Sequence, residues 1–511
     1  MSRGRIAGGL VRMQSPQRFI ILPPLGVRLA SSGVRLARGA LPLERFLASI
    51  APPRREARRV GAPGVEAPQA TMRILDSVHP DGAKLIEMRP DDLMKLRTAQ
   101  PGVRVVPEIF FRAARAPRPR VLAVAAAARR TVTVTLRVVS RPDGTPVAGA
   151  DVIAFTDYAA SEGGEGRTDA AGKVRLRLPA TARRIERLFV FPALGFWGAL
   201  GKNVAVKAEM QVALRPIDLR EPDALRHFYG FAPRAMGRAV TVGIIDTGVG
   251  DHPDLAVEGG ANTVPGEKES DWRDNGAGHG THVAGIVAAR GASGHGVRGL
   301  APGVHLRSYR VFGKGADGAS KYAILKALDR AVAAGGDLVT LSLGGPDRDE
   351  ATRSAIIDAR AQGTLVICAA GNDGRGPVAY PGAEQHALAV SAMGRRGTFP
   401  ADSTHAAEIT APYGRDRANF IARFSNVGPE IDLTAPGVAI VSTVPGGYAA
   451  WDGTSMACPA VTGAAAALLA RERHALRMVR SQARSDEMAR LVLATARSLG
   501  FGVRFQGRGM L

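Results

Sequence analysis

The second half of the chain alternates continuous apolar runs with helical stretches, and this succession limits the possible folds more than any other feature. The apolar runs occupy residues 240–245, 338–343, 364–370 and 387–392. The helical stretches occupy residues 281–289, 321–334, 350–362 and 456–470. Strands without polar alternation are typical of a parallel sheet that is covered on both faces. Residues 239–511 are therefore predicted to form a doubly wound α/β domain, in which functional sites lie at the carboxyl ends of strands.

Residues 131–217 follow a different period, because apolar and polar side chains alternate every two residues. Runs of this kind occupy residues 131–139, 147–155, 173–178 and 204–214. Turn sequences such as that from Asp169 to Gly172 separate them. Short alternating strands at this spacing predict a β-sandwich domain. We expect linkers at residues 113–130 and 218–238 on either side of it.

The first part of the chain, residues 18–112, is predicted to be a small α+β module. Its expected strands occupy residues 18–26, 72–77, 83–88 and 103–111, and its expected helix occupies residues 91–98. A Pro- and Arg-rich loop at 46–71 interrupts it, and residues 1–17 form an N-terminal tail.

Charge and cysteine content exclude several classes of protein. The 511 residues carry a net charge of +22, but the arginines are scattered among Ala, Pro and Gly without interleaved aromatic residues, so we expect no nucleic-acid partner. Two cysteines cannot form the multi-bridge framework of a small secreted protein. The sequence has no apolar run of membrane-spanning length, and its run at 19–22 stops at Pro23, so it makes no secretory signal. We favour a cytoplasmic over a secreted location.

Four polar side chains mark the ends of strands and the starts of helices in the α/β domain. They are Asp246, His279, Asn372 and Ser455. Singly, each has a plain structural interpretation: an aspartate can cap a turn, and a serine in the small-residue turn 453–459 can serve close packing. A second histidine, His282, follows His279 by three residues, but the spacing of a zinc-binding helix and a third ligand are lacking, so we predict no metal site.

Together these side chains supply the parts of a nucleophilic serine. A serine hydroxyl needs a base to take its proton, and a carboxylate holds the imidazole base in the required tautomer. Ser455, His279 and Asp246 fill these three roles. Asn372 and the backbone N–H of Ser455, at the start of a helix, are expected to donate to the oxygen of the attacked carbonyl, where negative charge develops.

Three sequence motifs resemble the signatures of the subtilisin-like serine proteases: DTG at 246–248, HGTHVAG at 279–285 and GTSMA at 453–457. The resemblance extends over residues 239–511. It implies the subtilisin-like fold and a serine endopeptidase that hydrolyses protein or peptide substrates through an Asp-His-Ser triad and an acyl-enzyme intermediate. It implies no required cofactor.

The resemblance also assigns residues around the substrate. Asn372 is similar to the family's oxyanion asparagine. Ser342, Leu343 and Gly344 resemble the strand that pairs with a bound peptide, and Gly371 belongs to the same substrate-binding set.

The N-terminal module resembles the inhibitory propeptide of this family. This likeness implies a proenzyme whose own N-terminal segment is an intramolecular inhibitor, with the β-sandwich as an addition to the family plan. Asp254 matches a calcium-ligand position, but the loop at 291–297 lacks the Asn or Asp side chain expected of the family's strong calcium loop. A structural calcium ion is therefore left open.

Two alternatives also stay open. Cys458 follows Ser455 by three residues, so its thiol is either a small buried side chain or a redox-sensitive neighbour of the site. The rival to an active enzyme is a lapsed protease fold that serves as a binding or scaffold protein and displays the β-sandwich. The presence of all four site residues argues against that rival.

Overall fold

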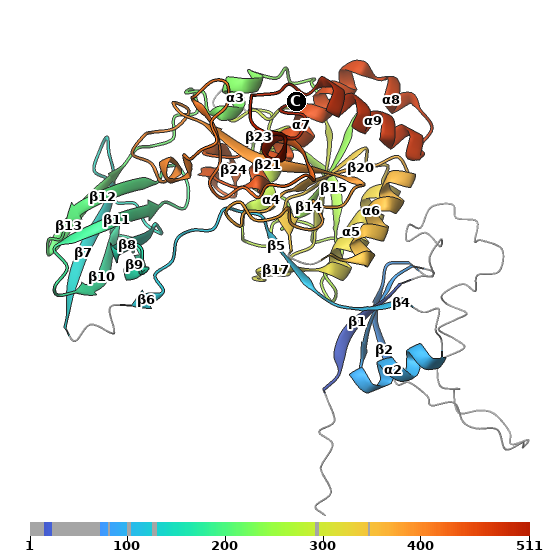
Figure 1. Cartoon of the computed structure of the whole chain (residues 1–511), viewed down its shortest axis with the longest axis horizontal. Helices are drawn as coiled ribbons and strands as arrows, with labels where there is room; N and C mark the ends of the chain where they lie inside the picture. The colour runs from blue at the N-terminus through green and yellow to red at the C-terminus, as the bar shows by residue number, and fades with distance from the viewer. Residues whose placement is uncertain are drawn as a thin grey trace, which may run out of the picture. The chain divides into compact units, whose positions relative to one another are not determined.

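The computed structural model describes residues 15–22, 72–79, 82–99, 104–124, 130–291, 296–345 and 348–511 (Figure 1). The chain divides into two compact units, Met1–Ile109 and Phe110–Leu511. Among the described helices, none combines the length and the hydropathy that a membrane span requires. The expected Pro- and Arg-rich loop at 46–71 lies outside the described residues.

The first unit contains a four-stranded antiparallel sheet in the order β2-β3-β1-β4. Its elements are β1 (Gln17–Leu22), β2 (Met72–Ser77), β3 (Lys84–Met88), β4 (Arg104–Pro107) and helix α2 (Pro90–Ala99). Helix α2 begins with Pro90, Asp91 and Asp92, which suit a helix start because of the fixed φ of proline and the favourable charge at the positive end of the helix dipole. Phe19, Ile86 and Leu96 belong to the small core of this unit.

One expected strand of the N-terminal module is two strands. The run at 103–111 divides into β4, which ends at Pro107, and β5 (Phe110–Ala113). Pro107 has no N–H to continue the ladder with β1. Strand β5 belongs to the second unit and pairs with β17 (Gly318–Ser320) and β19 (Leu343–Gly344).

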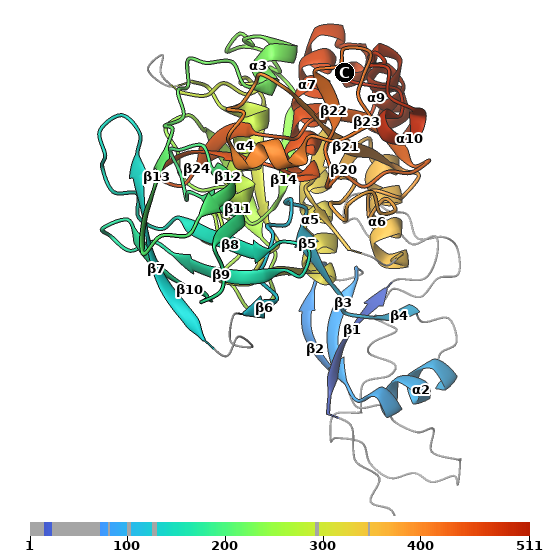
Figure 2. The same ribbon diagram turned by 60° about the vertical axis from the view of Figure 1, so that its left-hand side comes forward.

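Two antiparallel-rich sheets pack within residues 123–214 (Figure 2). The smaller has the order β10-β7-β13, with β7 (Thr131–Ser140), β10 (Lys173–Pro179) and β13 (Glu209–Leu214). The larger has the order β12-β11-β8-β9-β6, with β6 (Ala123–Val124), β8 (Asp151–Asp157), β9 (Glu162–Arg167), β11 (Arg184–Phe191) and β12 (Ala199–Ala205). Leu136, Val152, Leu176 and Val190 bring side chains of both sheets into one buried core. We refer to this pair of sheets as the sandwich.

The two-residue alternation of apolar and polar side chains did not predict every strand of the sandwich. Strand β9 is Gly- and Glu-rich, and β11 mixes charged with aromatic residues, so neither shows a clean two-residue period. The expected strand at 204–214 is divided between β12 and β13, which belong to different sheets.

The large sheet of the second unit has eight strands in the order β15-β16-β14-β18-β20-β21-β22, with β23 paired to β21. These strands are β14 (Thr241–Asp246), β15 (Val257–Asn262), β16 (His305–Arg310), β18 (Leu338–Leu341), β20 (Leu365–Ala369), β21 (Ala387–Arg395), β22 (Asn419–Ile421) and β23 (Ile431–Pro436). Paired strands of this sheet run parallel, except that β21 and β22 are antiparallel. Strands β18 and β20 are buried along their whole length, as the continuous apolar runs predicted.

Helices cover both faces of this sheet (Figure 1). Helices α4 (His279–Ala288) and α7 (Thr454–Glu472) pack against each other and the sheet, and α5 (Lys321–Ala333) and α6 (Glu350–Ala361) form the second pair. The remaining elements are α3 (Ala224–Tyr229), α8 (His474–Arg477), α9 (Gln482–Thr495), α10 (Val503–Gln506), the 3₁₀ helix η3 (Thr404–Glu408) and the hairpin of β24 (Ile440–Val444) and β25 (Gly447–Trp451). This arrangement confirms the predicted doubly wound α/β fold, with the carboxyl ends of β14, β18 and β20 at one edge.

Replacing Leu469, which is fully buried on α7, with Ala should lower the free energy of unfolding by about 2–5 kcal/mol, because the change removes apolar contacts and leaves a cavity. Thermal unfolding of the purified chain measures this loss as a lower Tm. The matched control is Leu122→Ala, whose side chain is 80% exposed. Equal effects of the two substitutions would contradict the position of Leu469 in the core.

Candidate functional site

Asp246 and His279 form a buried pair at the carboxyl end of β14 and the start of α4. The Asp246 Oδ1 atom lies 2.7 Å from His279 Nδ1 and also accepts the backbone N–H of Thr247 at 2.7 Å. With a carboxylate oxygen as the acceptor, His279 donates from Nδ1, which leaves its Nε2 for another partner. This Nε2 atom is buried and has no hydrogen-bond partner among the described residues.

Glycines let the backbone approach this pair closely. A Cβ at Gly280 would lie 2.3 Å from the carbonyl oxygen of Gly248, a distance that no side chain tolerates. Gly280 of the HGTHVAG motif is therefore needed to bring α4 close to the end of β14.

Ser455 lies in the first turn of α7, and its side chain is buried. Its hydroxyl donates to the carbonyl oxygen of Ser342 at 2.9 Å rather than to the imidazole of His279. Its backbone N–H donates to the carbonyl oxygen of Ala114 at 3.1 Å. The structure thus brings Ser455 to the predicted peptide-binding strand and places a carbonyl group against the start of α7, where unpaired backbone N–H groups gather.

Asn372 and Gly371 are held through Thr454, the neighbour of Ser455. The Asn372 Oδ1 atom accepts from the backbone N–H of Thr454 at 2.9 Å and from its hydroxyl at 3.0 Å. The backbone N–H of Gly371 donates to the same hydroxyl at 3.1 Å. With its oxygen engaged in this way, Asn372 keeps its amide Nδ2 as a hydrogen-bond donor that Thr454 does not use.

Strand β5 carries the chain's own backbone across this site. It lies between β17 and β19, with Ala113 opposite Leu343 and Arg112 opposite Gly344. The ladder continues beyond it, because the N–H of Ala114 donates to the carbonyl oxygen of Ser342 at 2.9 Å. Ser342, Leu343 and Gly344, the residues predicted to bind a peptide, therefore contact an extended peptide segment of this chain.

The same segment stays bound beyond Ala114. The N–H of Ala116 donates to the carbonyl oxygen of Asp452 at 2.9 Å. Gly453 has a φ of +155°, and a Cβ there would lie 2.8 Å from the carbonyl oxygen of Ala114. A side chain at position 453 would thus push the segment away from Ser455.

The side chains of β5 alternate between a buried and an exposed position. Phe111 is 1% exposed and lies against Gly345, where a Cβ would be only 3.2 Å from the phenyl ring, whereas Phe110 is 59% exposed. Sequence reasoning placed both phenylalanines in the expected strand 103–111 of the N-terminal module and a linker from residue 113 onward, so it did not predict their contact with the site. Two adjacent phenylalanines before an Arg- and Pro-rich stretch were the available sign of a bound segment. The strands that pair with β5, however, lie more than 200 residues away in the sequence.

His282 is a structural residue of α4. Its Nε2 lies 3.1 Å from the carbonyl oxygens of Ile440 and Ala449, and its ring stacks on Trp451 at 4.5 Å between centroids. Burial lowers the pKa of His282 to about 3, so the ring is neutral. Among the described residues, no group of three or more His, Cys, Asp or Glu side chains is arranged to hold a metal ion.

The Asp254 carboxylate, which matches a calcium-ligand position, is engaged by protein groups among the described residues. Its Oδ2 atom accepts the hydroxyl proton of Tyr448 at 2.9 Å, and a Cβ at Gly296 would lie 2.2 Å from the carboxylate oxygens. A calcium ion needs six to eight oxygen ligands. Among the described residues, the hydroxyl of Tyr448 already engages this carboxylate, and residues 292–295 of the nearby loop lie outside the described residues.

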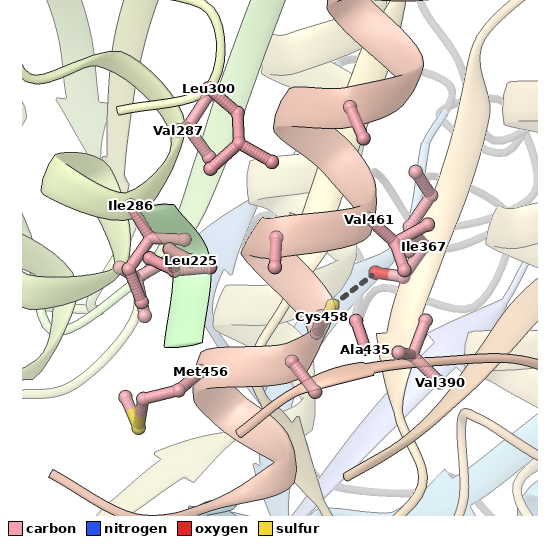
Figure 3. Packing of buried hydrophobic residues seen from close by; sticks show 14 of the residues in the cluster. Leu225, Ile286, Val287, Leu300, Ile367, Val390, Ala435, Met456, Cys458 and Val461 are labelled. Carbon is pink, nitrogen blue, oxygen red and sulfur yellow. Dashed lines mark hydrogen bonds between the residues drawn. The ribbon is translucent and has the colours of Figure 1, made fainter. Parts of the chain in front are cut away.

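Cys458 is buried between α7 and the sheet, and Figure 3 shows its thiol pointing to the carbonyl oxygen of Ile367. The sulfur lies 3.3 Å from that oxygen and 3.1 Å from the hydroxyl of Thr340. Burial raises the pKa of Cys458 to about 12. Because the thiolate is the reactive form, these surroundings favour the interpretation of Cys458 as a small packing residue.

Comparisons with known proteins concern the second half of the chain. The subtilase family model matches residues 237–509. Subtilisin Savinase of Lederbergia lenta is 40% identical over 231 residues, which are 45% of this chain and 76% of that protein. An alkaline protease of Alkalihalobacillus alcalophilus is also 40% identical over 231 residues, but these are 54% of its length. Subtilisin DY of Bacillus licheniformis is 39% identical over 241 residues, 46% of this chain and 78% of that protein.

These matches confirm the predicted family, its α/β fold and its enzyme class. They concern the part of the chain that holds Asp246, His279, Asn372 and Ser455, and the first 236 residues lie outside the family match. The chain belongs to the subtilase family of serine-type endopeptidases.

Proposed function

We propose that the chain is a proenzyme that cleaves its own peptide bond between Ala114 and Arg115 and then hydrolyses other proteins with the same site. One observation carries this proposal: the carbonyl oxygen of Ala114 accepts a hydrogen bond from the backbone N–H of Ser455, while the N–H of Ala114 donates to Ser342. The bond that follows Ala114 is thus held as a substrate would be. In this proposal Ser455 is the nucleophile, His279 the base and Asp246 its orienting partner.

The reaction begins with a rotation of the Ser455 hydroxyl from Ser342 toward the free Nε2 of His279. The oxygen then attacks the carbonyl carbon of Ala114 as its proton passes to Nε2, and Asp246 stabilises the resulting imidazolium. The carbonyl oxygen gains negative charge beside the N–H of Ser455 and the amide donor of Asn372. His279 returns the proton to the nitrogen of Arg115, the Ala114–Arg115 bond breaks, and water later releases Ala114 from Ser455.

Cleavage at this bond gives the N-terminal segment an inhibitory role. The new carboxyl terminus at Ala114 follows β5, which is hydrogen-bonded to β17 on one side and β19 on the other. A cleavage product whose strand β5 is hydrogen-bonded on both sides occupies the groove until it dissociates or is degraded. Residues 18–112 therefore belong to the inhibitor, whereas the sandwich follows the broken bond and stays with the protease domain.

Ser455→Ala should abolish this self-cleavage, because no other group in the proposed mechanism can form the acyl-enzyme. Mass spectrometry of the purified wild type should detect a fragment that begins at Arg115, and the variant should remain intact. Ser354→Ala, on helix α6, is the matched control and should be processed normally. A wild-type fragment with a different first residue would contradict the assigned bond, and processing of Ser455→Ala would contradict the assigned nucleophile.

Loss of the amide donor of Asn372 should lower kcat by about 10²–10³, the range found when one oxyanion-hole donor is removed from subtilisin. Asn372→Ala and Asn372→Asp are compared in steady-state hydrolysis of a peptide. The aspartate keeps an acceptor for both hydrogen bonds from Thr454 but has no amide donor. Full activity of Asn372→Asp would show that these hydrogen bonds, and not the donor, matter.

Phe111→Ala should slow self-cleavage about tenfold or more, since burial of a phenylalanine stabilises the bound segment by roughly 1.5–3 kcal/mol. Phe110→Ala removes the same group from an exposed position and should change the rate less than twofold. Both rates are followed on gels as loss of the full-length chain. If the two variants are slowed equally, the buried phenyl ring does not hold the segment in the groove.

A further inference from the structure

The sandwich forms one wall of a cavity that begins beside the site and has a volume of about 600 Å³. Phe189, Phe191 and Tyr158 line it from the sandwich, and Asn372 and Trp451 line it from the protease domain. Residues 115–119, which follow the proposed scissile bond, also line this cavity. The residues that follow the proposed scissile bond, on its leaving side, therefore contact both the sandwich and the protease domain.

This wall is attached firmly to the protease domain. The N–H of Gly195 donates to the carbonyl oxygen of Tyr448 at 2.8 Å, and that of Leu200 donates to Asp402 at 2.8 Å. Trp197 is buried in the core cluster of the protease domain. These two hydrogen bonds and the buried side chain of Trp197 hold the sandwich against the protease domain, beside the groove.

Arg118 makes the most specific contact of this segment with the sandwich. Its Nη1 atom lies 2.5 Å from Asp151 Oδ2, and its guanidinium carbon lies 4.6 Å from the ring centroid of Phe191. Asp151 and Phe191 are directly opposite each other on the neighbouring strands β8 and β11. A carboxylate beside an aromatic face suits the flat guanidinium group, which pairs and stacks at once, better than the ammonium group of lysine.

The prolines on either side of Arg118 restrict the backbone conformation around it. Pro117 and Pro119 fix φ on either side and keep the residues before them extended. Nearer the bond, the guanidinium of Arg115 lies 3.9 Å from the ring centroid of Trp451. The first and fourth residues after the proposed bond are therefore both arginines on aromatic faces, one on the protease domain and one on the sandwich.

We propose that the sandwich is a substrate-binding extension of the protease groove that selects proteins with arginine at the fourth position after the scissile bond, bound by Asp151 and Phe191. This inference rests on the proposed function, because it takes residues 115–119 as the leaving side of a substrate. The substrates it predicts carry a small residue, then arginine, then a second arginine three residues further on.

The cleaved chain itself competes for this extension. The N–H of Leu122 donates to the carbonyl oxygen of Ser161 at 3.0 Å, and β6 pairs with β9, so the new N-terminal arm stays anchored to the sandwich. An incoming substrate must displace Arg118 of this arm. The Arg118→Gln enzyme keeps the binding site at Asp151 and Phe191 but lacks the arginine side chain that competes for it. This variant is therefore the enzyme used in the test.

The test uses two internally quenched peptides that copy residues 110–119 and differ only in arginine or glutamine at the position of Arg118. On the processed Arg118→Gln enzyme, kcat/KM should be about fivefold to tenfold higher for the arginine peptide, as expected for one cation–π contact with one partly exposed ion pair. Arg118→Gln/Asp151→Asn should lower this ratio to about twofold to threefold, because the ion pair is lost and the contact with the Phe191 ring remains. Arg118→Gln/Glu209→Gln, with a carboxylate removed from an exposed position on β13, should leave the ratio unchanged.

The readout is a ratio on one enzyme, so a variant with a smaller folded fraction gives the same value. Equal cleavage of both peptides by the Arg118→Gln enzyme would overturn the inference and leave the serine endopeptidase standing. Cleavage of neither peptide, with no labelling of Ser455 by a fluorophosphonate, would overturn the proposed function and this inference together.

Discussion

The burial of α7 is the constraint on which the site depends. The helix packs on α4 and on β18, β20, β21 and β23, so its side chains must be small in nearly every direction. A Cβ at Gly463 would lie 2.9 Å from the Cβ of Leu300, which shows how closely the neighbouring loop approaches. Met456 points to one side of the helix, and Cys458 and Val461 point to the side of Ile367 (Figure 3). Because the helix cannot shift or rotate without repacking all of these contacts, the backbone N–H of Ser455 has one fixed direction, which is the condition for a preorganised oxyanion donor.

Features that depend on neighbouring residues could be predicted from the sequence, whereas pairings between distant segments could not. The strands β14, β18, β20 and β21 were predictable because burial on both faces leaves a continuous apolar run. The turns that carry Asp246, His279 and Ser455 were predictable because their glycines and small residues are required by close backbone approach. Strand β5 was predicted only in part, as the end of the strand at 103–111. Its pairing could not be predicted, because its two partners are short, distant in the sequence and irregular in composition. Strands β9 and β11 were missed for a related reason, since glycine and charged residues on an exposed face hide the two-residue period.

In the proposed scheme, the residues around Ala114, which the sequence assigned to a linker, allow the same groups to serve inhibition and catalysis. The N–H of Ser455 and the carbonyl oxygen of Ser342 are the partners that a substrate needs, and Ala114 uses both. A covalently attached segment is present at a high effective concentration, so it excludes other peptides while the chain is whole. The proposed cleavage would leave these hydrogen bonds in place and remove the covalent tether that raises the effective concentration of the segment. In the proposed scheme, the activity of the processed chain is then set by dissociation of β5 rather than by a rearrangement of Asp246, His279 and Ser455.

Chain order also accounts for the position of the sandwich beside the leaving side of the groove. Strand β6 begins at Ala123, nine residues after Ala114, and nine residues span at most about 30 Å when fully extended. While Ala114 is bound at Ser455, the sandwich must therefore lie within that distance, on the side toward which the chain leaves the site. A domain inserted elsewhere in the sequence would have no such restriction. In the proposed scheme, the insertion between the N-terminal segment and the protease domain makes the sandwich a wall of the groove, with the partly buried Phe191 of β11 where a bound peptide passes.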